Sequence, residues 1–311
     1  MGLLRLSNRA AIRRGMPARC AILALGLVLG VAAAHPAIAA CDLTDGPTAK
    51  VARVVDGETL ELEDGRTVRL VGVLAPRVPR WWRKQETWPP AEAARVALAA
   101  LAEGQTVALK FGGAREDRRA RLLAHVFVAR GDERLWAQAH LVGLGLARAV
   151  SFKDNRACLR ALQTREAEAR AARRGLWSRR LYGVLKADDA QALLKRLQSY
   201  QLVEGRVAAV AKRRRWTFVN FGTDWKRDFT VAVAAGDRRR FAKSDVDLVA
   251  LAGRHVRVRG WIESWNGPAI KATHPEQIEL LGGAAETAAV PPVAAPNEKN
   301  PAREAPGSDL R

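Results

Sequence analysis

The sequence is short of acidic residues, aromatic residues and cysteine. Aspartate and glutamate together number 32 against 52 lysines and arginines, which leaves a formal charge of +20. Aromatic residues make up only 6% of the chain, yet nine of them are tryptophans that gather in a few short segments. Hydrophobic residues still reach 48%, which is enough for packed cores, and 311 residues allow two ordinary domains with extensions.

The apolar run near the N-terminus is too short to be a membrane anchor. It covers residues 21–34, follows five arginines and is followed by Ala37-Ile38-Ala39. Roughly 14 apolar residues fall short of the roughly 20 that a spanning helix needs. The pattern is typical of a secretory signal peptide. We therefore expect residues 1–40 to be removed and the protein to be exported, to the periplasm or the medium, with no integral membrane span.

Cysteine is scarce enough for its pairing to be considered directly. Cys20 lies in the predicted signal peptide, so Cys41 and Cys158 remain, and an oxidising compartment favours a disulfide between them. The run Ile38-Ala39-Ala40-Cys41 also resembles a bacterial lipobox. In that alternative Cys41 carries a lipid anchor and Cys158 is a lone thiol. The disulfide is favoured, because Ala37-Ile38-Ala39 suits ordinary cleavage equally well.

The shortage of acids persists without the signal peptide. Removing residues 1–40 takes away five arginines and no acid, so the formal charge falls only from +20 to +15. Such a charge attracts polyanions, which include nucleic acid, an anionic membrane surface and cell-wall polymers. Charge thus selects a class of partner without distinguishing among its members.

Residues 41–180 alternate between strand and helix patterns. The turn signals Asp56-Gly57 and Asp64-Gly65 separate the first strands, and Gly104 and Gly175 end helices. We expect strands at 51–55, 59–62, 67–73, 106–111 and 122–128, and helices at 91–101, 134–144 and 155–174. Five strands with helices between and after them fit an α+β fold that is mainly β, built on a small OB-type barrel.

The rest of the chain divides into three further segments. Residues 181–200 suggest a linker helix, mainly over 186–200. Residues 201–281 form a second β-rich domain punctuated by glycines, which we expect to be a small OB-like barrel. Its strands are predicted at 202–210, 215–221, 228–234, 255–264 and 268–273. Residues 282–311 have no apolar periodicity, and their composition predicts a disordered tail.

Four ordered blocks of the first domain carry a family resemblance. The runs Val54-Val55-Asp56-Gly57-Glu58-Thr59-Leu60 and Arg69-Leu70-Val71-Gly72-Val73-Leu74-Ala75-Pro76 come first, followed by 117–124 and 158–177. Together they resemble the staphylococcal nuclease (thermonuclease) family over about residues 50–180. The resemblance implies a five-stranded barrel with helices and phosphodiester hydrolysis.

The chemistry of that family needs a Ca²⁺ ion, a carboxylate base and two arginines on the phosphate. The resemblance places Arg69 and Arg121 at the two arginine positions and Glu58 at the first metal-binding aspartate. Leu74 stands at the second metal aspartate and Arg77 at the proposed general base. Leucine has no oxygen ligand and arginine cannot take a proton at neutral pH. We therefore expect Ca²⁺ to bind weakly or not at all.

These departures lead to one main functional hypothesis and two alternatives. The main one is an exported thermonuclease-like protein that binds nucleic-acid phosphodiesters, DNA or RNA, with hydrolysis weak or lost. The first alternative is an active nuclease that uses Ca²⁺ and carboxylates from elsewhere, such as Glu86 or Glu92. The second is an envelope protein that binds anionic polymers of any kind.

Further candidate contacts with nucleic acid come from two basic runs. Arg118 and Arg119 lie in the arginine-rich loop 115–121, although such a run is also typical of a solvated face. In the second domain a basic run leads directly into an aromatic strand, which suits single-stranded nucleic acid, although alternate aromatic residues also fill small cores. The candidates there are Lys212, Arg213, Arg214, Trp216 and Phe218.

Overall fold

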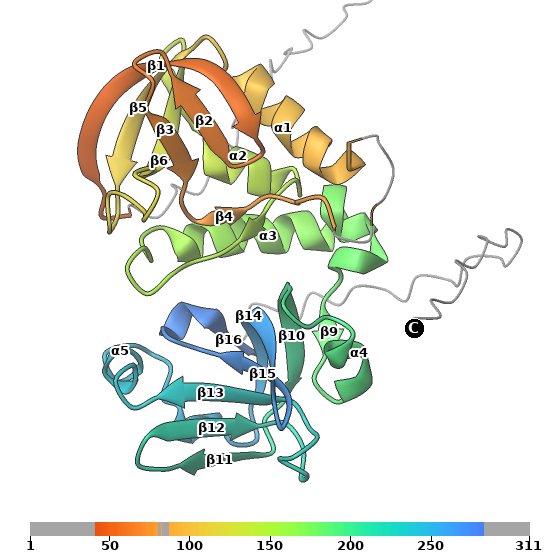
Figure 1. Ribbon diagram of the computed structural model, residues 1–311. Coiled ribbons are helices and arrows are strands. Elements are labelled where there is room, and N and C mark those ends of the chain that lie inside the picture. Colours follow the sequence, from red (N-terminus) through yellow and green to blue (C-terminus); the bar gives the residue numbers. More distant parts are fainter. Residues whose placement is uncertain (1–40, 80–81, 83–86, 283–311) are drawn as a thin grey trace, which may run out of the picture. The chain divides into compact units, whose positions relative to one another are not determined.

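The computed structural model describes residues 41–79, 82 and 87–282 (Figure 1). The predicted signal peptide, the predicted tail from residue 283 onward and Glu86 lie outside the described residues. Within the described ranges, no helix combines the length and the apolar character needed to cross a membrane.

The first sheet has six strands in the order β3-β2-β1-β5-β6-β7. They are β1 (Thr44–Asp56), β2 (Thr59–Leu62), β3 (Thr67–Leu70), β5 (Thr106–Phe111), β6 (Leu122–Arg130) and β7 (Glu133–Trp136). β3 also pairs with β6 in parallel, with Val68 opposite Leu122, so that five strands close into a barrel. The predicted α+β fold with a five-stranded barrel is confirmed.

The barrel closes because β1 is long and bent. The first half of β1 pairs with β5 and its second half with β2. Register shifts between Val51 and Arg53 and between Val54 and Asp56 mark the bulges that bend a strand in this way. The inward side chains are aliphatic and fully buried, among them Leu60, Leu70, Leu109 and Val126.

Helices cover the barrel largely where the periodicity predicted them. They are α1 (Pro89–Ala102), α2 (Ala137–Gly143), α3 (Leu159–Ala171) and the 3₁₀ turn η1 (Gly175–Ser178), with the short strands β4 (Val73–Leu74) and β8 (Arg148–Ala149). The helix predicted over 134–144 begins only at Ala137, because the preceding residues pair with β6 as β7. α3 begins after Cys158, whose φ of 62° lies outside the helical region.

The second sheet region follows a path β11-β12-β13-β15-β14-β10-β9, with β16 paired to β14. Its strands are β9 (Leu185–Lys186), β10 (Tyr200–Arg206), β11 (Ala209–Lys212), β12 (Trp216–Asn220), β13 (Thr230–Ala234), β14 (His255–Trp265), β15 (Gly267–Lys271) and β16 (Ile278–Leu281). Its helices and 3₁₀ turns are η2 (Arg180–Tyr182), α4 (Ala190–Leu194), α5 (Arg238–Ala242), η3 (Val249–Leu251) and η4 (Pro275–Gln277). The segment expected to be a linker helix, 181–200, is α-helical only over α4.

The pairings of the second sheet region repeat those of the barrel. β10 pairs with β14 as the first half of β1 pairs with β5, and β11 pairs with β12 as the second half of β1 pairs with β2. β13 and β15 are parallel, like β3 and β6. Such pairing is compatible with an OB-like barrel, and the assignment of this region to that fold stays a prediction.

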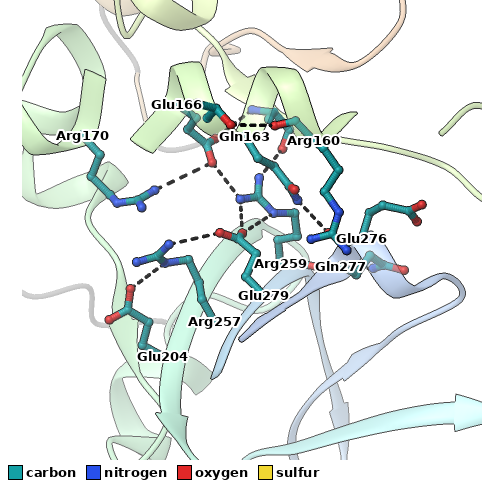
Figure 2. Close-up of polar contacts among 12 residues, drawn as sticks. Arg160, Gln163, Glu166, Arg170, Glu204, Arg257, Arg259, Glu276, Gln277 and Glu279 are labelled. Atoms are coloured by element: carbon teal, nitrogen blue, oxygen red, sulfur yellow. Dashed lines mark hydrogen bonds and ion pairs between the residues drawn. The ribbon is translucent and has the colours of Figure 1, made fainter. Parts of the chain in front are cut away.

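Polar side chains connect α3 with β14 and β16 (Figure 2). The fully buried Arg259 places Nη2 2.9 Å from Glu166 Oε2 and donates from Nε to Glu279 Oε1 at 3.0 Å. Its Nη1 donates to the carbonyl oxygen of Ala149 at 2.9 Å. Both sheets fall within one compact unit. The division into domains at residues 180 and 201 therefore stays a prediction.

A disulfide joins Cys41, which precedes β1, to Cys158, which precedes α3. The two Cα atoms are 5.0 Å apart and the residues are 117 positions apart in the chain. The predicted pairing is confirmed. A lipid anchor on Cys41 would need the same Sγ atom, so the two states of this residue exclude each other.

Candidate functional site

A tight hairpin turn buries the carboxylate of Glu58. Gly57 and Glu58 form the turn between β1 and β2, and the Glu58 amide donates to Asp56 Oδ1 at 2.8 Å. A Cβ on Gly57 would lie 2.6 Å from the Cβ of Ala94 and 2.9 Å from that of Ala75, so only glycine lets the turn pack this closely. Glu58 is left 1% exposed.

Both carboxylate oxygens of Glu58 are engaged by donors. Oε1 accepts from Arg77 Nη2 at 2.7 Å and from Arg69 Nη2 at 3.2 Å, while Oε2 accepts from the Ala75 amide at 2.9 Å. The Arg69 side chain, on β3, is 17% exposed, whereas that of Arg77 is 67% exposed. The hydrogen bond to Glu58 raises the pKa of the Arg77 guanidinium. A buried carboxylate is thus balanced by two guanidinium groups.

Leu74 takes part in packing at the neighbouring position. It lies on β4 opposite Arg148 of β8 and packs against a buried apolar cluster that includes Val150, Trp177 and Leu202. Among the described residues there is no group of three or more histidine, cysteine, aspartate or glutamate side chains that could hold a metal ion. Glu92, one of the alternative carboxylates, is held on α1 by two hydrogen bonds from Arg95.

Asp117 organises the arginine loop that precedes β6. Its Oδ1 accepts from the amides of Arg119 and Arg121, and its Oδ2 accepts from Arg121 Nε at 2.8 Å and Nη2 at 2.6 Å. Burial would raise the pKa of this carboxyl, but the hydrogen bonds from Arg121 and the backbone outweigh it, so the pKa is lowered. The loop is a defined turn that fixes the Arg121 guanidinium.

A cavity of about 600 Å³ brings five arginines of the first domain together. We call it the arginine cavity. It is lined by five arginines, by three carboxylates and by residues of two loops. The arginines are Arg69, Arg77, Arg118, Arg119 and Arg121. The structure therefore gathers all four arginines predicted for this domain and adds Arg77, while Glu58 lies behind the lining.

The five candidates of the second sheet region lie apart from the arginine cavity. Lys212, Arg213 and Arg214 are exposed at the turn between β11 and β12. Trp216 is half-buried, with its ring centroid 4.7 Å from that of Trp265 in an edge-on contact. The half-buried Phe218 and the exposed Arg213 line a separate pocket, which Trp216 does not line.

Three residues near the arginine cavity were not predicted as site residues. Asp117 had a usable signal, because an acid inside a run of arginines suggests an internal ion pair. Phe152, 44% exposed, and Asn155, whose Nδ2 donates to the Ala114 carbonyl at 2.9 Å, also line the cavity. Neither residue has a local sequence signal, since the patterns that predict strands and helices do not predict the conformation of loops.

Residues 67–179 match the family model described as staphylococcal nuclease homologue. The chain therefore contains a staphylococcal nuclease homologue domain. The match includes Arg69, Leu74, Arg77 and Arg121 and begins after Glu58, whose place in the family pattern stays a prediction. The second sheet region lies outside the match. No curated protein matches the chain.

Proposed function

We propose that this protein binds nucleic-acid phosphodiesters in the arginine cavity and hydrolyses them slowly or not at all. The observation that carries the proposal is the pairing of Arg77 with Glu58. It puts a permanent cation at the position where the family resemblance places the general base, 2.7 Å from the carboxylate placed as the first metal ligand.

The binding half of the proposal is supported by the chemistry of guanidinium groups. Arginine donates in a fork that matches two phosphate oxygens, and it keeps its charge at any physiological pH. Arg69 and Arg121 are only 17% and 20% exposed and each is held by a carboxylate, so both are ordered before a ligand arrives. Arg118 and Arg119 are exposed and line the same cavity, so the lining keeps an excess of positive charge.

The donor set around Glu58 does not fit Ca²⁺. Calcium takes six to eight oxygen ligands, and here one buried carboxylate is already bound by two guanidinium groups and one amide. A cation bound at Oε1 would have to displace Arg77 and would meet the like charge of Arg69. Leu74 adds no oxygen.

The loss of a base acts on rate independently of the metal. A positioned general base contributes typically about 10²–10⁴-fold, and arginine cannot accept the proton of an attacking water. With the metal ligand also missing, the rate should fall by at least about 10⁴-fold relative to a site that has both.

Purified mature protein tests binding and cleavage in one assay. Labelled single- and double-stranded DNA and RNA are incubated with Ca²⁺ or with a chelator, and retention and cleavage are scored together. We expect retention that ignores the chelator and weakens steeply with salt, because phosphate contacts release counterions. Rapid Ca²⁺-dependent digestion that disappears in Glu58→Ala would overturn the proposal in favour of an active nuclease.

Matched variants assign the binding to the cavity. Arg69→Gln and Arg118→Gln should each weaken binding by a similar factor for all sequences and reduce the salt slope by about one. Arg239→Gln removes the same charge from α5, outside the cavity, and should change little. Competition with a heparin-like polymer tests the envelope alternative, since a general polyanion binder would show no preference for nucleic acid.

We further propose that the protein works after export, in the periplasm or outside the cell. The disulfide between Cys41 and Cys158 supports this, because such bonds persist in oxidising compartments. Mass determination of the native N-terminus tests the proposal: a chain that starts at or just before Cys41 with no lipid agrees with it, and an intact residue 1 contradicts it.

A further inference from the structure

A pocket of about 430 Å³ lies on the outer face of the second sheet region. The strand register places Phe218 between Ala211 and Ala232, and Asn220 opposite Thr230. The intervening residues of β12 and β13 point the other way, into the buried apolar core. Alanines at the centre of this face leave a hollow between larger side chains, of a size typical of small-molecule sites.

Aromatic rings wall this pocket. Phe218 and Trp265 meet edge-on, with ring centroids 5.7 Å apart. Trp225 is 56% exposed although the loop that carries it is well tied: the Asp224 amide donates to Asp228 Oδ2 at 2.8 Å, and the Lys226 amide donates to Asp224 Oδ1 at 3.0 Å. This loop holds a large, exposed aromatic ring against the pocket, where it can stack on a planar ligand.

The charge around the pocket is positive. Arg213 lines the pocket, the described lining residues include no carboxylate, and its other polar groups are the side chains of Asn220, Thr230 and Asn266. The turn between β11 and β12 carries the basic run Lys212–Arg215, whereas in the loop of Trp225 the charges of Lys226 and Arg227 are balanced by Asp224 and Asp228. A planar apolar ligand that bears a negative charge would stack on the aromatic walls and pair with the basic residues around the pocket.

We infer that this pocket, between Trp225, Trp265 and Phe218, takes an unpaired nucleobase of single-stranded nucleic acid, with Arg213 on the adjoining phosphate. Bases stack on aromatic side chains whatever their sequence, and a basic groove follows the backbone. A neutral sugar would use the aromatic walls but not the arginines. The inference extends the proposed function to a second surface and does not depend on binding in the arginine cavity.

The test separates base contacts from phosphate contacts. Binding of the full mature chain is measured for a single-stranded oligonucleotide, for an oligomer of the same length and charge made of abasic residues, and for a duplex. Stacking is worth about 1–3 kcal/mol per base, so the oligonucleotide should bind about 5- to 150-fold more tightly than the abasic oligomer. The duplex, whose bases are paired, should gain nothing from the pocket.

Variants locate that preference. Trp225→Ala should remove most of it, Trp225→Phe should keep part of it, and all forms should retain their duplex affinity. Arg213→Gln should weaken single-strand binding more than Arg254→Gln, which removes an exposed arginine that does not line the pocket. Trp225 is on the surface, so its variants should keep the far-UV spectrum of the wild type.

Three outcomes would overturn the inference: equal binding of oligonucleotide and abasic oligomer, a base preference that survives Trp225→Ala, or displacement of the oligonucleotide from the pocket by a neutral cell-wall oligosaccharide. A failure of duplex binding with the base preference intact would instead count against the arginine cavity alone.

Discussion

Replacing Arg259 with methionine should destabilise the protein strongly, because it removes the cation in closest contact with the buried carboxylate of Glu166. Arg259 is 0% exposed and contacts Glu166, itself 0% exposed, at 2.9 Å, as well as Glu279 (Figure 2). Burial alone would lower the pKa of its guanidinium, but Glu166 and Glu279 outweigh that effect and raise the pKa. Methionine fills similar space and cannot carry the charge.

The expected loss is about 3–5 kcal/mol of unfolding free energy, the range for removing one partner of a buried ion pair. It should lie towards the lower end, because Arg257 still contacts Glu279 and the Ala149 amide still donates to Glu166. Urea unfolding followed by tryptophan fluorescence gives the value. Arg254→Met, an exposed change just before β14, should cost less than about 0.5 kcal/mol.

A double variant tests the cause. Arg259→Met combined with Glu166→Gln removes the uncompensated charge, so it should be more stable than Arg259→Met alone. An unpaired Glu166 is ruled out as the cause if Arg259→Met lowers the unfolding free energy by less than about 1 kcal/mol. It is also ruled out if Glu166→Gln destabilises the Arg259→Met protein as much as it destabilises the wild type.

Three further predictions follow from other parts of the structure. Reducing the disulfide between Cys41 and Cys158, or the variant Cys158→Ser, should lower the unfolding free energy by about 2–5 kcal/mol in urea, because the bond closes a loop of more than a hundred residues. Burial lowers the pKa of His274 to about 4, so the unfolded chain binds the extra proton between that pH and the ordinary 6.5. The contribution of His274 to the unfolding free energy should therefore be fully present above pH 6.5 and be lost as the pH falls towards 4. The loss from this group is on the order of 3 kcal/mol, and His274→Gln should flatten the dependence of stability on pH. Restoring oxygen ligands with Leu74→Asp and Arg77→Glu together should create Ca²⁺ binding measurable by calorimetry, which the wild type should lack at the same concentrations.

The sequence predicted the barrel well because its signals were local. Alternating aliphatic residues, Asp-Gly turns and glycine stops located most strands and helices of the first domain to within a few residues, although β1 begins at Thr44 and not at the predicted residue 51. The errors arose where pairing with another strand decided the outcome. Residues 133–136 have helix-compatible composition, but β6 offered them hydrogen bonds as β7. The linker segment 186–200 failed as a helix because Tyr200 begins β10 and Leu185–Lys186 pairs with that strand.

The sequence predicted which residues form the candidate site but not which of them pair with one another. Arg69, Arg118, Arg119 and Arg121 were chosen from the sequence, and the cavity gathers them. Asp117 accepts three hydrogen bonds from Arg121 and one from the Arg119 amide, and these depend on a turn shape that periodicity does not encode. Of the second pocket, Arg213 and Phe218 were chosen from the sequence, whereas Trp225 and Trp265 were not, since its walls come from three segments that only the fold brings together.

The two departures at positions 74 and 77 are physically coupled through Glu58. A carboxylate that is 1% exposed is stable as an anion only if a cation lies beside it, since burial of an unpaired charge costs several kcal/mol. Arg69 alone, at 3.2 Å, is shared with the open cavity, and Arg77 at 2.7 Å supplies the second cation. If position 74 is the metal position that the resemblance implies, a Glu58 neutralised by Arg77 leaves it no need for an oxygen, and the leucine present there packs on the apolar cluster. Leu74→Asp alone should therefore destabilise the protein without creating a metal site, because Arg77 would still occupy Glu58. The single variant Arg77→Glu should be less stable than the double variant with Ca²⁺ bound, because it sets two carboxylates together with only Arg69 as a cation beside them.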